Sequence, residues 1–157
     1  MKQKKLIGIM VCILTLSCTA LSSAQETDIG LGIIVGEPTG LAGKYWLDKD
    51  TAIAGAAAWS FEGKDTMHLH MDWLRHNWEL IRDSAEVTQG EIPLYYGIGG
   101  RIRLGEEAVI GIRFVIGLSY MFEEAPFDMF IEVAPIMDLT PSTEMNGNAA
   151  FGVRFWF

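Results

Sequence analysis

The sequence is poor in cysteine and, beyond its first residues, has no long apolar run. Both cysteines, Cys12 and Cys18, lie in an N-terminal segment, 1–24, that is typical of an export signal. The expected mature chain, 25–157, therefore has no cysteine, which excludes disulfide bridges, thiolate catalysis, zinc–thiolate sites and iron–sulfur clusters. No later stretch approaches the roughly 20 apolar residues of a transmembrane helix.

The segment 1–24 has the three parts of a Sec signal peptide. Lysines at positions 2, 4 and 5 precede an uncharged apolar run from Leu6 to about Leu21, and small residues follow at Ser22–Ala24. We expect cleavage after Ala24. The alternative is lipid attachment at Cys18, although Thr15 stands where an aliphatic residue is usual in a lipoprotein signal.

Basic residues are also scarce, since 12 Lys and Arg face 20 Asp and Glu, for a formal net charge of −8. Such a chain has no basic face for nucleic acid. Half of its residues are hydrophobic, and 17 glycines argue against long helices. Dispersed apolar residues with many glycines favour strands.

Hydrophobic and polar or small residues alternate with period two, the signature of strands whose successive side chains point to opposite faces. In 108–122, for example, Ile110, Phe114 and Tyr120 share one face while Gly111 and Arg113 share the other. Turn residues separate the alternating segments. Eight strands are predicted, at 28–36, 40–47, 51–61, 66–74, 92–103, 108–122, 127–137 and 148–157.

The polar face decides the predicted architecture. An apolar face on every strand would be far too large for a water-exposed surface, so we expect it to face lipid and the charges to face inward. The fold class is therefore all-β: one domain, 25–157, forming an eight-stranded antiparallel up-and-down transmembrane β-barrel. We expect side chains to fill its interior as a charge network. The predicted network is Lys44, His68, His70, Asp72, Arg101, Arg103, Arg113, Asp128, Glu132 and Arg154.

The last predicted strand, 148–157, has a further feature, an aromatic pattern at its C-terminal end. Its outward positions end in an aromatic residue, which resembles the terminal signal of bacterial outer-membrane barrels and would put both termini in the periplasm. The residues of this signal are Phe151, Val153, Phe155 and Phe157. The charged stretch 75–91 fits poorly, because periplasmic turns are usually short. Either it is a long turn, or the strand continues through His76, Trp78 and Leu80 after a bulge.

The chain resembles the small eight-stranded outer-membrane barrels of the OmpA transmembrane-domain type, and more closely a barrel family of spirochaetes and other didermal bacteria. The resembling segments are 36–41, 44–47, 68–72, 93–101, 126–128 and 132–135. The resemblance implies an integral outer-membrane barrel, contact with lipid and assembly by the barrel-assembly machinery through the C-terminal strand. It implies no activity, no cofactor and no catalytic residue.

Two chemical functions, zinc binding and lipid A modification, are alternatives to a purely structural interior. His68, His70 and Asp72 share one strand face and have the ligand types that suit zinc. His68 and His70 could also serve a lipid A-modifying enzyme at the outer rim, although no nucleophile motif accompanies them. An interior hydrogen-bond network is the simpler reading of these histidines.

We therefore expect a monomeric structural barrel without catalysis, acting in envelope integrity or surface contact. Of the predicted surface loops, 138–147 is the one long enough to dock a partner, which makes a surface receptor the binding alternative. The sequence leaves open the surface partner and whether the lumen conducts.

Overall fold

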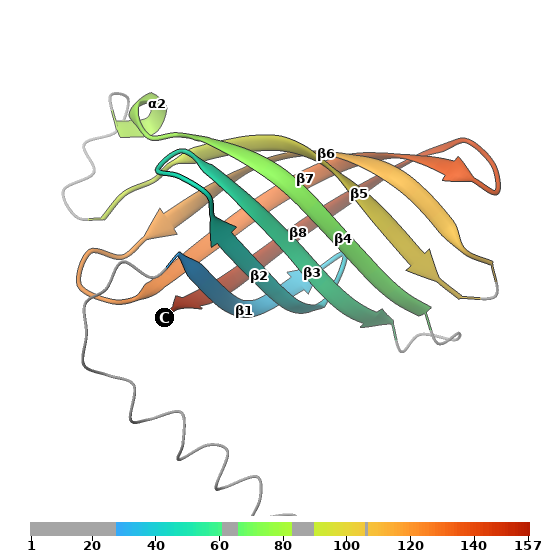
Figure 1. Ribbon diagram of the computed structural model, residues 1–157, viewed down its shortest axis with the longest axis horizontal. Coiled ribbons are helices and arrows are strands. Elements are labelled where there is room, and N and C mark those ends of the chain that lie inside the picture. The colour runs from blue at the N-terminus through green and yellow to red at the C-terminus, as the bar shows by residue number, and fades with distance from the viewer. Residues whose placement is uncertain (1–27, 61–65, 83–89, 106) are drawn as a thin grey trace, which may run out of the picture.

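The computed structural model describes residues 28–60, 66–82, 90–105 and 107–157, and these form eight strands and one short helix (Figure 1). The helix, α2, covers only Glu79–Arg82. No described helix has the length and apolar character to cross a membrane. The strands are β1 Ile29–Gly36, β2 Gly40–Trp46, β3 Thr51–Ser60, β4 Thr66–Asn77, β5 Leu94–Leu104, β6 Val109–Met121, β7 Phe127–Thr140 and β8 Glu144–Trp156.

The strands form one closed barrel in which each strand is antiparallel to its chain neighbours. The first and last strands close it, with Gly32 opposite Arg154 and Ile34 opposite Gly152. Closure leaves no open edge, so the ladder satisfies the backbone groups along every strand. The predicted all-β, eight-stranded, up-and-down barrel is confirmed. The expected signal segment, 1–24, lies outside the described residues.

The two faces of the wall are inverted relative to a water-soluble barrel. Outward side chains are large and apolar: Ile33 is 55% exposed, Leu41 58% and Ile131 57%. Inward positions of the same strands hold glycine, alanine and charged residues, and Arg113 and Asp128 are fully buried. The alternation in the sequence therefore predicted which side chains face in and which face out.

The wall is taller on one side than on the other. Strands β1 and β2 have 8 and 7 residues, whereas β6, β7 and β8 have 13, 14 and 13. The β7–β8 hairpin consequently extends beyond the short wall at the end opposite the termini, on the right in Figure 1. We call that end the far mouth and the other the terminal end.

The predicted loop 138–147 is wrong, because most of it belongs to this hairpin. The strands pair from Ile136 opposite Asn146 to Asp138 opposite Glu144, and only 141–143 connect them. Asp138 points inward and is 3% exposed. Buried ion pairing therefore extends a strand where the local composition indicated a turn.

The ambiguous stretch 75–91 is partly strand. β4 continues to Asn77 with its register unbroken, placing Arg75 opposite Tyr96 and His76 opposite Tyr95. The expected bulge is absent from this described ladder, and the chain turns into α2 instead of continuing as a strand through Leu80. Residues 83–89 lie outside the described part. The strand count, and with it the topology, is as predicted.

The β2–β3 turn at the terminal end is fixed by one carboxylate. Asp48 Oδ1 accepts hydrogen bonds from the backbone N–H groups of Asp50 (2.9 Å) and Thr51 (2.8 Å). These bonds, that of Asp50 first, favour the charged form and lower the pKa of Asp48.

Candidate functional site in the barrel interior

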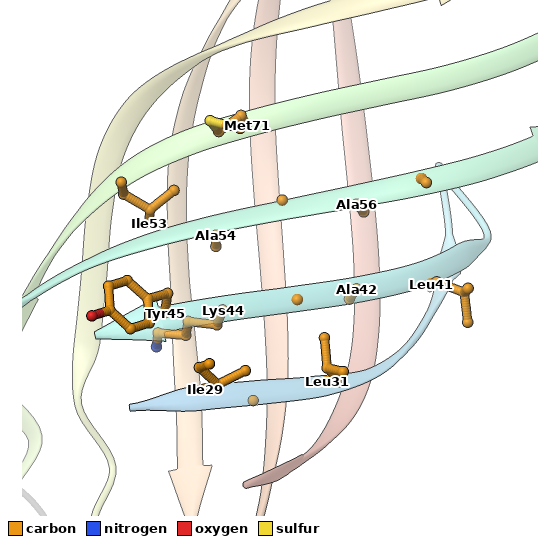
Figure 2. Close-up of a pocket in the computed structure, with 14 residues that line it drawn as sticks. Ile29, Leu31, Leu41, Ala42, Lys44, Tyr45, Ile53, Ala54, Ala56 and Met71 are labelled. Atoms are coloured by element: carbon orange, nitrogen blue, oxygen red, sulfur yellow. The ribbon is translucent and has the colours of Figure 1, made fainter. Parts of the chain in front are cut away.

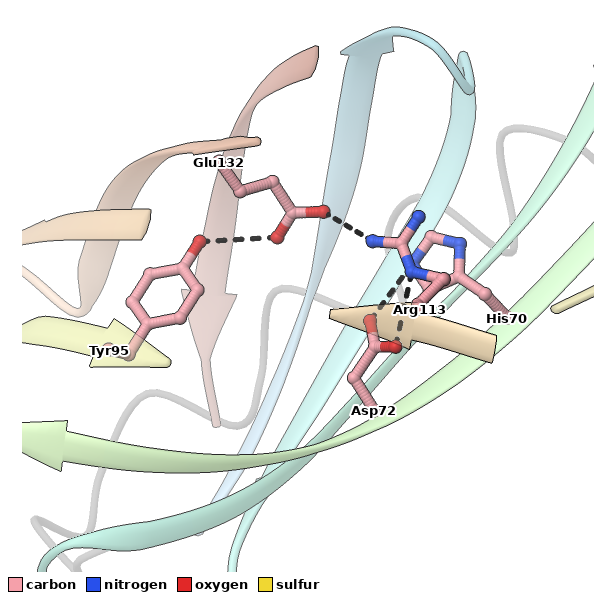
Figure 3. A network of polar contacts seen from close by, with 5 residues as sticks. All are labelled: His70, Asp72, Tyr95, Arg113 and Glu132. Carbon is pink, nitrogen blue, oxygen red and sulfur yellow. Dashed lines mark hydrogen bonds and ion pairs between the residues drawn. The ribbon is translucent and has the colours of Figure 1, made fainter. Parts of the chain in front are cut away.

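The centre of the lumen is organised around Arg113 of β6, whose side chain is completely buried (Figure 3). Its Nε donates to Asp72 Oδ1 at 3.1 Å, and its Nη2 donates to Glu132 Oε1 at 3.0 Å. The Tyr95 hydroxyl donates to the other oxygen of Glu132 at 3.2 Å. His70 Nε2 lies 3.7 Å from Asp72 Oδ2. One guanidinium thus joins β4, β6 and β7 across the barrel.

Two further ion pairs lie on either side of this centre along the barrel, one toward the terminal end and one toward the far mouth. Arg154 donates from Nε (3.0 Å) and Nη2 (2.5 Å) to the two oxygens of Asp128. Arg101 makes the same forked contact with Asp138, at 2.9 and 2.5 Å, and Asn146 Nδ2 also donates to that carboxylate at 2.6 Å. Such bidentate pairs combine charge with fixed geometry. They place Asp138 and Asn146, which the sequence reading had assigned to a loop, in the network.

Lys44 is stabilised differently. Its Nζ lies 2.7 Å from His76 Nε2, and it sits over the rings of Trp46 (4.3 Å) and Tyr95 (5.4 Å). His76 Nδ1 lies 3.2 Å from the carbonyl oxygen of Asp50, to which it donates. The imidazole can then accept from the ammonium at Nε2. His76 was missing from the predicted network, although it continues the inward parity of Asp72.

Three tryptophans stack at the terminal end of the lumen, and we call them the tryptophan cap. The Trp46 ring stacks on that of Trp156 (6.2 Å between centroids) and on that of Trp78 (5.8 Å). Trp78 Nε1 donates to the carbonyl oxygen of Lys49 at 3.0 Å, which ties this cap to the β2–β3 turn. The interior is therefore aromatic at one end and ionic through the middle.

Inward glycines make room for these large side chains. A Cβ added at such a glycine would press against the side chain directly opposite it on the neighbouring strand, tightly at Gly30 and with a clash at the others. Small and large residues thus alternate around the inner wall, as expected for close packing in a narrow lumen. The pairs are Gly30 with Trp156, Gly97 with Leu74, Gly99 with Asp72, Gly111 with Asp138, Gly117 with Tyr95, and Gly152 with Phe130.

The structure places every predicted network residue on the inner face. Most are buried, while His68 and Arg103, nearest the far mouth, are half-buried. Tyr95, Asp138, Asn146 and His76 join the network as described above. For Asp138, Asn146 and His76 the signal was inward parity, read beyond the strand ends that turn-like composition implied. Tyr95 is an inward position within the predicted strand 92–103. The predicted residues that are at most 9% exposed are Lys44, His70, Asp72, Arg101, Arg113, Asp128, Glu132 and Arg154.

The structure does not support zinc binding by His68, His70 and Asp72, which was the alternative to an interior hydrogen-bond network. The rings of His68 and His70 are 5.6 Å apart, centroid to centroid, and edge-on, and Asp72 is already bonded to Arg113. Among the described residues, no three His, Asp or Glu side chains are grouped so that they could hold a metal ion together. Both imidazoles also face the lumen, not the lipid-facing rim that an acyl chain would reach.

The outer wall of β1–β3 has one apolar hollow of about 500 Å³ (Figure 2). Gly43 and Gly55, which lie opposite each other in the β2–β3 ladder, line it together with Leu31, Tyr45 and Met71. It is a dent in the outward apolar surface, and inward residues of the same strands, Lys44 among them, also contribute to its lining.

The residues of the predicted C-terminal signal lie on the outer face of β8 and at the chain end that follows it. The ring of Phe155 packs edge-on against those of Phe127 and Phe157, each 5.0 Å away between centroids. Phe157 N donates to the carbonyl oxygen of Ile29 at 3.2 Å, so the chain end is held at the closing seam. Recognition of this strand by an assembly machinery stays a prediction.

Comparison with known proteins identifies the fold. No protein-family model matches the sequence, and no curated protein matches it. Among solved structures, the N-terminal β-barrel domain of Pseudomonas aeruginosa OprF is similar, with a TM-score of 0.58 and 15% sequence identity. The match covers 85% of this chain and 100% of that one. The chain therefore has the fold of the small eight-stranded OmpA-like outer-membrane β-barrels.

Proposed function

We propose that this protein is an integral outer-membrane barrel with a structural role. Its lumen does not conduct ions or solutes, and it has no catalytic activity. The observation that carries the proposal is the inversion of the wall, with large apolar side chains outside and ion pairs inside. Outward residues on every strand are mostly apolar, Arg75 near the terminal end of β4 being an exception, and many are about half exposed. A water-soluble protein rarely exposes so large a continuous apolar surface.

A bilayer explains both faces. Hydrocarbon accepts the outward side chains, and a closed barrel leaves no unpaired strand edge in it. The interior of an eight-stranded barrel is just wide enough for side chains to fill it. Here Arg113, its two carboxylate partners and the tryptophan cap occupy the middle and the terminal end. We infer a plug that braces the wall, and hence a contribution to envelope integrity.

The partners of such a barrel follow from its surface. Outer-membrane lipid covers the wall, and its acyl chains fill the hollow beside Gly43 and Gly55. The barrel-assembly machinery would recognise β8 through its terminal aromatic residues. We propose a monomer, exported by the Sec pathway. With 138–147 paired as a hairpin, the receptor alternative loses the long loop on which it depended.

The test is gel migration of washed outer membranes in SDS, with and without heating. A closed barrel that faces lipid resists SDS, so the unheated protein should migrate differently from the boiled sample. The control is the soluble periplasmic fraction of the same cells. A single heat-independent band confined to the periplasm would contradict the proposal.

A further inference from the structure

The outer wall of β2 and β3 has small residues at outward positions, where most of the wall has large ones. Gly43, Gly55 and Ala57 line the apolar hollow of about 500 Å³ (Figure 2). The fold does not require glycine at position 43, because its φ is not in the left-handed region and an added Cβ would come no closer than 3.4 Å to Leu31. The hollow is therefore not a by-product of packing inside the barrel.

An aromatic row lies on the terminal side of this hollow. Tyr45 and Trp73 flank Ile53 in the ladder, and both rings are outward and about half exposed. Exposed Tyr and Trp side chains gather where the hydrocarbon of a bilayer meets its headgroups. The row therefore indicates the headgroup level beside the hollow.

The hollow is within reach of an acyl chain that starts at this level. Met71, which lines the hollow, and Arg75 are both outward on β4 and four residues apart, which is about 13 Å along the strand. The hydrocarbon of one leaflet is about 15 Å deep. A lipid with its headgroup beside Arg75 can therefore place an acyl chain in the hollow.

Charges of both signs stand beside Arg75. Its side chain is half exposed, and its Nη2 lies 3.8 Å from Asp50 Oδ2, which is longer than a hydrogen bond. Acidic and basic residues are nearly balanced among the described residues at this end of β1–β4 and in α2. These residues are Asp28, Asp48, Lys49, Asp50, Arg75, Glu79 and Arg82.

We propose that this face of the barrel binds one glycerophospholipid with an ethanolamine headgroup, its phosphate against Arg75 and one acyl chain in the hollow. The inference rests on the proposed membrane location and adds which lipid the short wall binds. Arg75 donates to the phosphate oxygens, and the lipid ammonium donates to the neighbouring carboxylate of Asp50. A choline headgroup has no N–H to donate, and an anionic headgroup would be repelled by the carboxylates.

Native mass spectrometry of the full mature barrel in detergent is the test. The protein is mixed with equal amounts of phosphatidylethanolamine, phosphatidylcholine and phosphatidylglycerol that have the same acyl chains. One ethanolamine lipid should stay bound, at least about fivefold more than either other lipid. Equal retention of the three lipids, or a preference for phosphatidylglycerol, would overturn the proposal. So would a dimer of the barrel in place of a lipid adduct, because a second copy would then cover the hollow.

Gly43→Leu fills the hollow and should lower retention of the ethanolamine lipid by at least about tenfold. Gly100→Leu is the matched control, since Gly100 is an outward glycine of β5 outside the hollow, and an added Cβ there has no atom nearer than 3.8 Å. It should leave retention intact. Equal retention by the two variants would contradict the proposal.

Arg75→Gln tests the headgroup separately, because this half-exposed side chain is not needed for packing. The variant should bind ethanolamine and choline lipids about equally, and heat-dependent migration in SDS checks that it is folded. An unchanged preference for ethanolamine would overturn the proposal.

This inference and the proposed function fail separately. A barrel confined to the soluble periplasm removes both the bilayer and the bound lipid. A heat-modifiable barrel in outer membranes that retains the three lipids equally keeps the integral barrel and removes only the lipid site.

Discussion

Gly99 and Gly100 are neighbours on β5 with opposite surroundings. A Cβ at Gly99 would collide with the carboxylate of Asp72, whereas one at Gly100 would approach no nearer than 3.8 Å to any other atom. We therefore expect Gly99→Ala to lower the free energy of unfolding by about 1–3 kcal/mol, the usual cost of overpacking. Gly100→Ala, the control, should change it little. Urea unfolding in lipid vesicles measures both, and equal effects would contradict the packing described for the inner face.

Tyr95 and Tyr96 offer a second matched pair. Tyr95 is 1% exposed and donates to the Glu132 carboxylate, while Tyr96 faces outward and is 51% exposed. Tyr95→Phe should destabilise the barrel by about 1.5–3 kcal/mol, because a buried charged acceptor loses a donor. Tyr96→Phe should be nearly neutral in the same unfolding experiment. An unchanged free energy of unfolding in Tyr95→Phe would mean that the buried Glu132 carboxylate does not need the hydrogen bond from this hydroxyl.

The sequence could predict the direction of these side chains but not their partners. Strand parity alone places Asp72, Arg113 and Glu132 inside. Which glycine lies opposite Asp72 depends on the β4–β5 register, and Gly97, Gly99 and Gly100 are all near at hand in the sequence. Long arginine side chains also reach across the lumen, so sequence spacing does not determine their pairing.

At the level of elements, the β7–β8 hairpin is longer than the sequence indicates. Pro135, Pro141 and the Asn146–Gly147 pair all favour turns locally. The inward Asp138 instead pairs with Arg101 of β5, and Asn146 supports it. Tertiary ion pairing overrides local composition here, which is why a strand end is the least predictable part of this fold. The strands that end at tight turns were predicted to within a residue or two, such as β2, which ends at Trp46 just before the turn at Asp48.

Asp138 provides the test of this element. Asp138→Ala leaves Arg101 buried without its carboxylate, and we expect a loss of about 3 kcal/mol, near the lower end for a broken buried pair, because the pair is close to the far mouth. Glu144 is the control, since it lies opposite Asp138 in the ladder but is exposed. Glu144→Ala should cost little by comparison. Equal thermal unfolding midpoints for the two variants would contradict the buried pair and indicate that Asp138 lies in a surface loop.

For the molecule as a whole, the surrounding medium decides what an outward charge costs. Ile116 and Ile110 are both outward on β6 and equally exposed, at 47% and 48%, but Ile116 is midway along the strand and Ile110 is near the far mouth. In a bilayer, Ile116→Lys should cost about 2–4 kcal/mol and Ile110→Lys about 0–1 kcal/mol. Folding yield and urea unfolding in vesicles measure the difference. Equal and small losses of stability for Ile116→Lys and Ile110→Lys would indicate that the outer wall faces water.

The proposed closed interior leads to an electrical prediction. With Arg113 spanning the lumen and the tryptophan cap at the terminal end, the purified barrel in a planar bilayer should carry no steady current. The control is the same bilayer with detergent alone. Discrete, long-lived conductance steps that scale with the amount of protein would contradict a plug.

The pairing of inward glycines with large residues also has a consequence for assembly. A slip of one position between two strands would turn charged side chains toward lipid, and a slip of two would set Tyr95 against Val115 or Ser119 in place of Gly117. The same slip would put Phe130 against Ala150 or Arg154 in place of Gly152. At the seams that carry such a pair, a shifted register loses the fit between an inward glycine and the large side chain opposite it. We therefore expect side-chain size on the inner wall to help select the native register as neighbouring strands pair, before the ion pairs in the lumen are complete.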